Sequence, residues 1–111
     1  MAYSEAVYAA LCQHLGAMPG LDERRMFGGI VFMLNGNMLC GAMSGHGMVR
    51  VGPGNEAAAL RIPGTFEMRQ GGAGRRMKGF VRFEPGLVED PATIARLIDY
   101  ALGFVGKMPS K

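Results

Sequence analysis

The residues with the greatest potential for chemistry are two cysteines and two histidines. Cys12 and His14 are two positions apart, and on a helix such residues point to different sides, so they cannot form a local thiolate–imidazole pair. Cys40 and His46 have neither nucleophile nor zinc-ligand spacing. We therefore expect no catalytic residue, no metal site and no cofactor, and we interpret both cysteines as small core residues. A small cysteine-dependent enzyme is the last alternative.

The carboxylates and serines offer no better candidate for catalysis. Acid–base chemistry needs two carboxylates that converge in a cleft, whereas Asp22-Glu23 and Glu89-Asp90 fall at the boundaries of expected elements. Asp90 is explained as a helix N-cap, because Pro91 follows it. No serine lies in a nucleophile-elbow pattern. The sequence therefore predicts a protein that is not an enzyme.

A basic segment is the second feature with chemical potential. Residues 61–82 carry a local charge of +5 in a chain whose net charge is +3. Such a segment attracts phosphate groups or an acidic partner, although a solvated loop is the other interpretation. The glycine-rich stretch 71–74 lacks the Gly-Lys-Ser/Thr ending of a phosphate loop. A weak, sequence-nonspecific nucleic-acid or anion site is expected at Arg69, Arg75, Arg76 and Lys78.

The elements that position these residues are predicted from apolar periodicity and turn residues. We expect a helix over residues 4–15, strands over 24–34, 38–43 and 48–51, and a short helix over 53–61. Strands over 65–69 and 77–83 follow, and then a last helix capped by Asp90. This order, α-β-β-β-α-β-β-α, predicts an α+β fold: an antiparallel sheet of about five strands with helices packed on it.

The centre of this fold is a β-hairpin that turns at Asn35-Gly36, a dipeptide typical of type I′ turns. A two-residue loop fixes the register, so we expect four facing pairs: Leu34 with Asn37, Met33 with Met38, Phe32 with Leu39, and Val31 with Cys40. Both faces of the hairpin are apolar. The second face therefore needs a cover of helices, of another sheet or of a second chain, and a homodimer is one expected solution.

Chain length and apolar runs set the remaining expectations. The 111 residues predict a single domain over 1–111, with a frayed tail over 106–111. The longest apolar runs are far shorter than the roughly 20 residues that a bilayer requires. The N-terminus lacks the pattern of a secretory signal. We therefore expect a cytoplasmic protein without a membrane partner.

A short motif suggests a family. Arg25-Met26-Phe27-Gly28-Gly29, followed by an apolar strand and Asn35-Gly36, resembles the opening of the N-terminal domain of the TfoX/Sxy family. The resemblance continues through Val49-Arg50-Val51 and Met77 to Val81 and ends with Glu89-Asp90-Pro91. It implies a non-enzymatic regulatory or protein-interaction domain, linked to transcriptional regulation of competence for DNA uptake.

The motif has a structural and a functional interpretation. In the first, Phe27 anchors the core, and Gly28 with Gly29 bends the strand or admits a neighbouring backbone. In the second, Arg24, Arg25, Phe27, Gly28 and Gly29 form a corner that docks a protein partner of unknown identity.

Overall fold

The fold is described by a computed structural model that covers residues 3–26, 28–69 and 74–111. Along the chain the elements are α1 (Glu5–Leu15), β1 (Leu21–Met26), β2 (Gly29–Leu34), β3 (Asn37–Met43), β4 (His46–Arg50), η1 (Pro53–Asn55), α2 (Glu56–Leu60), β5 (Thr65–Arg69), β6 (Arg76–Phe83), η2 (Pro85–Glu89) and α3 (Pro91–Val105). The predicted α+β class with an antiparallel sheet is confirmed, and the sheet has six strands rather than five.

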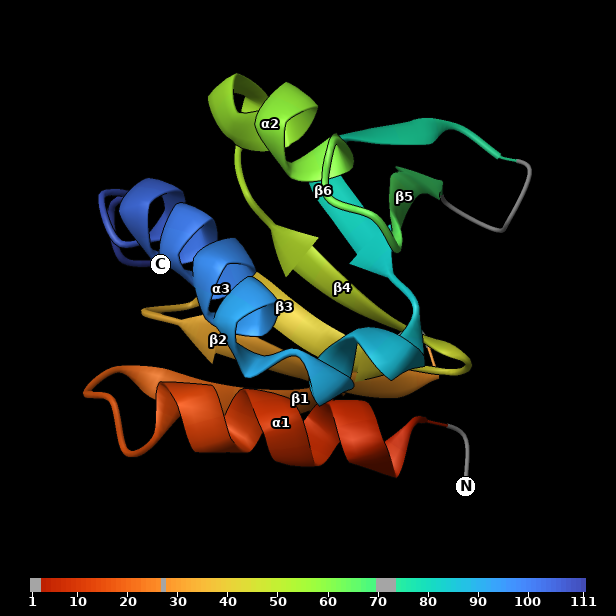
Figure 1. The fold of residues 1–111 in the computed structure, drawn as a ribbon. Coiled ribbons are helices and arrows are strands. Elements are labelled where there is room, and N and C mark those ends of the chain that lie inside the picture. The colour runs from red at the N-terminus through yellow and green to blue at the C-terminus, as the bar shows by residue number, and fades with distance from the viewer. Residues whose placement is uncertain (1–2, 27, 70–73) are drawn as a thin grey trace.

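The sheet has the strand order β1-β2-β3-β4-β6-β5, so β1 and β5 are its edges. Helices α1 and α3 lie together on one face of the sheet, and α2 sits at the end formed by β5 and β6 (Figure 1). Both long helices begin as the sequence predicts. Ser4 Oγ accepts a hydrogen bond from the Val7 N–H, and Asp90 Oδ1 accepts one from the Thr93 N–H.

The single strand predicted over residues 24–34 is wrong. The segment contains two antiparallel strands, β1 and β2, and β1 begins three residues earlier than expected, at Leu21. Gly28, with φ of 75°, adopts the left-handed backbone that the chain reversal before β2 requires. The prediction failed because residues 22–25 of β1 are all exposed and charged, and so show no apolar alternation.

The hairpin turn is confirmed, and half of its predicted register is wrong. Asn35 and Gly36 both have positive φ, at 53° and 84°, as a type I′ turn requires. The pairs next to the turn, Leu34 with Asn37 and Met33 with Met38, form as expected. A bulge between Phe32 and Met33 then shifts the pairing by one residue, so Phe32 faces Cys40 and Val31 faces Gly41.

Two clusters of buried side chains occupy the two faces of the sheet. The larger cluster lies between the sheet and the helices, and Val7, Phe32 and Leu97 belong to it. The second, which we call the methionine cluster, consists of Val31, Met33, Met43 and Met48, with Met26, Met38, Met68 and Phe80 packed partly buried around them. All of its described members come from strands, and its four central side chains are at most 6% exposed. The prediction of a homodimer therefore no longer follows from an uncovered second face.

The C-terminal residues, for which we expected fraying, lie against the hairpin turn. The Lys111 N–H donates a hydrogen bond to the Asn35 carbonyl at 2.9 Å. Asn37 Nδ2 donates one to the Pro109 carbonyl at 3.0 Å. In the described part of the chain, no helix is long and apolar enough to cross a membrane.

Candidate functional site

Strand β1 brings the arginines of the predicted docking corner to an edge of the sheet. Arg24 and Arg25 are exposed, and as neighbours on a strand they point to opposite faces. Arg24 Nε lies 3.6 Å from Asp22 Oδ2, and both side chains are more than half exposed, so this ion pair contributes little to stability. Among the described residues, no strand pairs with the outer side of β1.

The hydrogen bonds of the β1–β2 pair show which backbone groups of β1 remain open. The Asn35 N–H donates to the Gly20 carbonyl at 2.9 Å, which makes residues 20 and 35 a hydrogen-bonded pair in the register of β1 and β2. Because such pairs alternate along an antiparallel ladder, Asp22 and Arg24 also direct their backbone groups toward β2. The N–H and C=O of Glu23 and Arg25 therefore point outward.

Leu21 completes this row of outward-facing backbone groups, but only in part. Its N–H donates to the Met18 carbonyl at 3.2 Å, so only its own carbonyl stays open. The outer side of β1 thus offers two donors and three acceptors, a template for an added strand.

The other edge of the sheet is less suited to such pairing. The pairing of β5 with β6 shifts register between Glu67 and Arg69, where β6 has the extra residues, so the ladder behind this edge is interrupted. Strand β1 keeps one uninterrupted register along all six residues. Of the two edges, β1 is therefore the more regular template for an added strand.

Helix α1 fixes the middle of β1 through one side-chain contact. The Tyr8 hydroxyl donates to Glu23, with its oxygen 2.9 and 3.0 Å from the two carboxylate oxygens. The hydrogen bond with Cys12, and then that with Glu23, raises the pKa of Tyr8, so its hydroxyl stays protonated. The Tyr8 ring also stacks on Phe32, with centroids 5.8 Å apart. Glu23 is thereby turned toward its own helix layer.

The two glycines of the corner have structural reasons to be glycine. A Cβ on Gly29 would overlap the Ala42 carbonyl and approach Met43 Sδ to 2.7 Å, so only glycine allows β2 and β3 to lie this close. Gly28 needs its positive φ, while the space around it is open. Phe27 lies outside the described residues.

The four predicted anion-binding residues are not equivalent in the structure. Arg76 binds the carboxylate of Glu56, which is only 4% exposed, and also lies 3.6 Å from Glu67. Arg69 forms an ion pair with Glu67 at 3.2 Å. Arg75 and Lys78 are exposed and form no ion pair within the described ranges.

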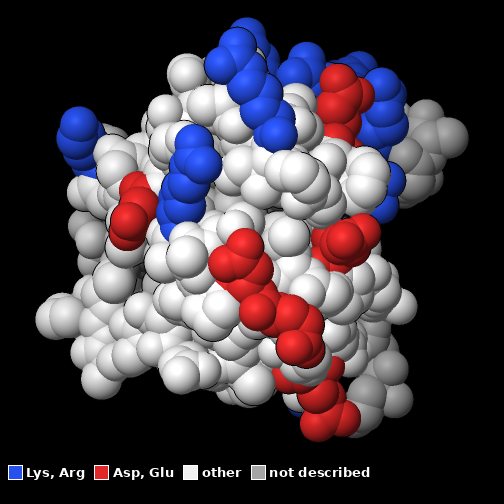
Figure 2. All heavy atoms as spheres, viewed as in Figure 1, with Lys and Arg blue, Asp and Glu red and all other residues white. Residues whose placement is uncertain are grey.

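Basic side chains nevertheless gather at one end of the molecule. Figure 2 shows Lys and Arg concentrated over the α2 and β5–β6 end, whereas acidic side chains form a band across the opposite half of the same face. Two arginine side chains also make cation–π contacts with aromatic rings. The Arg82 guanidinium lies 5.0 Å from the centre of Phe66, which is 44% exposed, and that of Arg50 lies 5.3 Å from the centre of Phe80.

Glu56 is an important residue that the sequence did not reveal. Its Oε1 accepts a hydrogen bond from the buried Gly79 N–H at 2.9 Å, while its Oε2 binds Arg76. It thereby joins the start of α2 to β6. The only local signal was a carboxylate at the start of a short alanine-rich helix, and that signal does not indicate burial.

Burial shifts the pKa of one cysteine and one histidine toward their neutral forms. Cys40 is fully buried, and burial, with Cys12 nearby, raises the pKa of its thiol. Burial lowers the pKa of His46, although its hydrogen bond with the Ser44 carbonyl opposes this effect and Arg82 adds to it. No group of three or more potential metal ligands occurs among the described residues.

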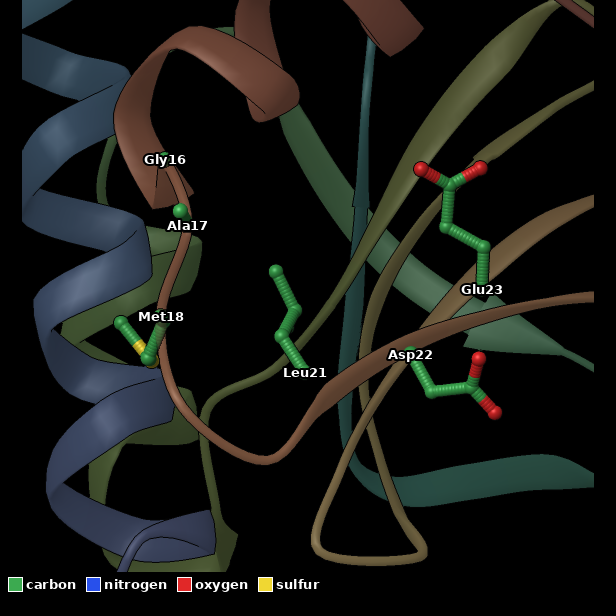
Figure 3. A pocket seen from close by; sticks show the side chains of 6 residues that line it. All are labelled: Gly16, Ala17, Met18, Leu21, Asp22 and Glu23. Atoms are coloured by element: carbon green, nitrogen blue, oxygen red, sulfur yellow. The ribbon is translucent and has the colours of Figure 1, made fainter.

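A surface hollow of about 540 Å³ adjoins the start of β1. It is lined by Gly16, Ala17, Met18, Leu21, Asp22 and Glu23. Figure 3 shows the Asp22 and Glu23 carboxylates pointing to opposite sides of the strand, so they cannot act on one bound group. The hollow is therefore not a site for paired-carboxylate chemistry.

Fold and site together define a class of protein: an α+β domain whose six-stranded antiparallel sheet has a regular, open edge strand. The model of the TfoX N-terminal domain family matches residues 13–105, and the chain belongs to this family. The resemblance seen around residues 25–29 is thereby confirmed. Neither the comparison with curated proteins nor that with solved structures found a match.

Proposed function

We propose that this chain is a non-catalytic, cytoplasmic regulatory domain that docks a protein partner along β1 and so takes part in transcriptional control linked to competence. The observation that carries the proposal is the uninterrupted β1 edge, where Glu23 and Arg25 hold their backbone groups outward. A partner in extended conformation can add a strand there through main-chain hydrogen bonds. Membership of the TfoX N-terminal domain family supports a regulatory role.

The side chains around the edge support docking of an acidic or mixed-charge strand. Arg24 and Arg25 present one cation on each face of β1, beside Asp22 on one face and Glu23 on the other, so a partner strand of mixed charge can place opposite charges against both faces. Such charges select among partners more than they raise affinity. The backbone of β1 therefore supplies the binding, and the two arginines supply the choice of partner.

The test is complementation in the native cell. The gene is deleted and then restored as the wild-type chain, as Arg24→Glu/Arg25→Glu, or as the control Arg96→Glu/Lys107→Glu, which makes the same charge change at exposed residues away from β1. Transcripts of competence genes and DNA uptake are measured. We expect deletion to change both, and the control but not the edge variant to restore them. Full restoration by the edge variant would overturn the proposal.

Weak nucleic-acid binding is the second candidate, favoured by Arg75 and Lys78 because both are exposed and lack an ion pair among the described residues. We expect affinity for a random duplex to fall steeply with added salt. Arg75→Ala/Lys78→Ala should reduce the slope of log affinity against log salt by about 1 for each phosphate that the variant no longer binds. If the wild-type chain shows no binding at low salt, or a slope unchanged in the variant, this candidate fails.

A further inference from the structure

We infer that the partner of the β1 edge is a second copy of this chain, paired antiparallel through β1 about a two-fold axis, so that the two sheets become one. The inference rests on the proposed function, because it names the partner of the same site. It differs from a dimer that buries the second apolar face, since the methionine cluster is already buried within one chain. Symmetric strand pairing uses the same patch on both copies.

The backbone of β1 fits a two-fold axis that passes beside Glu23. With Glu23 opposite the partner's Glu23, the N–H of each donates to the carbonyl of the other. The same register places Arg25 opposite the partner's Leu21, where the Arg25 N–H meets the open Leu21 carbonyl. The Leu21 N–H is not needed, and it is already bonded to Met18. Every outward N–H of Glu23 and Arg25 is thus satisfied.

The side chains of β1 are self-complementary in this register. Asp22 lies opposite the partner's Arg24, and the symmetry repeats the pair on the other side of the axis. These are non-hydrogen-bonded positions, where facing side chains are closest, so the opposite charges interact best there. The two Glu23 residues face each other at a hydrogen-bonded position, where side chains are farther apart. Each Glu23 carboxylate also accepts a hydrogen bond from the hydroxyl of Tyr8 in its own copy.

A shift of the axis by one residue is less favourable. With the axis beside Arg24, Glu23 would face the partner's Arg25 at a hydrogen-bonded position, where the opposite charges are farther apart and attract less, and residues 21–25 would form the same number of backbone hydrogen bonds. However, Arg24 would then face the partner's Arg24 at a close position, and like charges directly opposite each other destabilise a strand pair. The charge order Asp-Glu-Arg-Arg over residues 22–25 therefore selects the register centred on Glu23.

Sedimentation equilibrium at low salt, from about 10 µM to about 1 mM protein, tests the inference over the range in which a weak interface associates. The variants are Asp22→Arg, Arg24→Asp and the double exchange Asp22→Arg/Arg24→Asp, with Asp99→Arg as the exposed control on α3. Each single reversal creates two like-charge pairs, so we expect dimerisation about tenfold weaker or more. The double exchange restores the opposite-charge pairs and dimerisation, and the control leaves dimerisation unchanged.

A backbone variant removes two of the four proposed hydrogen bonds, one from each copy, without changing the Asp22–Arg24 pairs. Arg25→Pro deletes an outward N–H, which an edge strand tolerates, and is expected to weaken dimerisation. Thermal melts at the lowest concentration verify that each variant is folded. A wild-type chain that stays monomeric up to about 1 mM overturns the inference, as does a dimer that is insensitive to reversal at residues 22 and 24.

The two proposals fail in distinguishable ways. A monomeric wild-type chain whose Arg24→Glu/Arg25→Glu variant still loses transcriptional control would overturn the homodimer and leave the proposed function in place. A dimer that responds to the charge reversals as expected, while the same edge variant restores transcription fully, would support the inference about self-pairing and overturn the proposed function.

Discussion

The link between Glu56 and β6 gives a sharp prediction about stability. Glu56 is 4% exposed and holds two groups from β6: the buried Gly79 N–H, at 2.9 Å, and the guanidinium of Arg76, which is 44% exposed. Glu56→Ala removes both interactions. Because Gly79 lies 23 residues away in sequence, the carboxylate is a tertiary link whose removal should destabilise the whole fold.

The expected cost follows from how well water can replace each interaction. The Gly79 N–H is buried and would be left without a partner, which costs about 1–3 kcal/mol. Arg76 is partly exposed and would regain water, so breaking the ion pair adds only about 0.5–1 kcal/mol. We therefore expect Glu56→Ala to lower the free energy of unfolding by roughly 2–4 kcal/mol. Glu56→Gln retains an acceptor for Gly79 and should cost about half as much.

Urea unfolding measures these differences in the free energy of unfolding. All variants are compared at one low protein concentration, so that self-association contributes equally to each. Arg76→Met is the partner variant, since it keeps the length of the side chain and leaves the buried carboxylate without its cation. Arg76→Met should lower the free energy of unfolding by at least as much as Glu56→Gln. If Glu56→Ala lowered the free energy of unfolding by less than about 1 kcal/mol, or if Arg76→Met did not lower it, Glu56 would not be a stabilising link. Arg76 would then be free to bind an anion.

Three further predictions concern the thiols, a histidine and the glycines. In the folded chain a thiol reagent should modify Cys12, which is partly exposed, well before Cys40, because Cys40 is buried and burial raises the pKa of its thiol. Equal rates of modification without denaturant would contradict this. Because burial lowers the pKa of His46, the unfolded chain binds its proton more readily, and stability is lost as the pH falls below about 6.5. Unfolding curves at pH 7 and 5 should therefore show a smaller loss for His46→Gln than for the wild-type chain, and equal losses would contradict the assignment. Gly29→Ala, which overlaps β3, should lower the melting temperature more than Gly28→Ala, which costs about 1–2 kcal/mol through its positive φ alone; the reverse order would contradict the packing argument.

The parts of the fold that sequence predicted are those set by local residues. Ser4 and Asp90 cap their helices, and Asn35-Gly36 forms its turn, because each of these structures depends on residues within a few positions. The bulge lies beside Phe32, whose ring packs in the cluster between the sheet and the helices, and it has no local signal in the sequence. Strand β1 was missed for a related reason: an edge strand with charge on both faces lacks the apolar alternation by which strands are predicted.

The candidate site was predicted in part. The sequence singled out Arg24 and Arg25, and the structure places both among the exposed residues of β1. It could not show that β1 is an edge, because strand order is a property of the whole fold. The basic segment was judged by charge alone, whereas Glu56 meets Arg76 across 20 residues of sequence. Ion pairing over such separations becomes visible only in three dimensions.

Amide hydrogen exchange along β1 reports directly on whether the outward backbone groups of this strand pair with a second copy. The Asp22 and Arg24 amides face β2 and should be protected at every protein concentration. The Glu23 and Arg25 amides face outward and should exchange rapidly in dilute solution. They should gain protection as the protein concentration is raised into the range where the dimer forms. Rapid exchange of both outward amides at all concentrations, with the protein shown to be associated, would contradict pairing through β1.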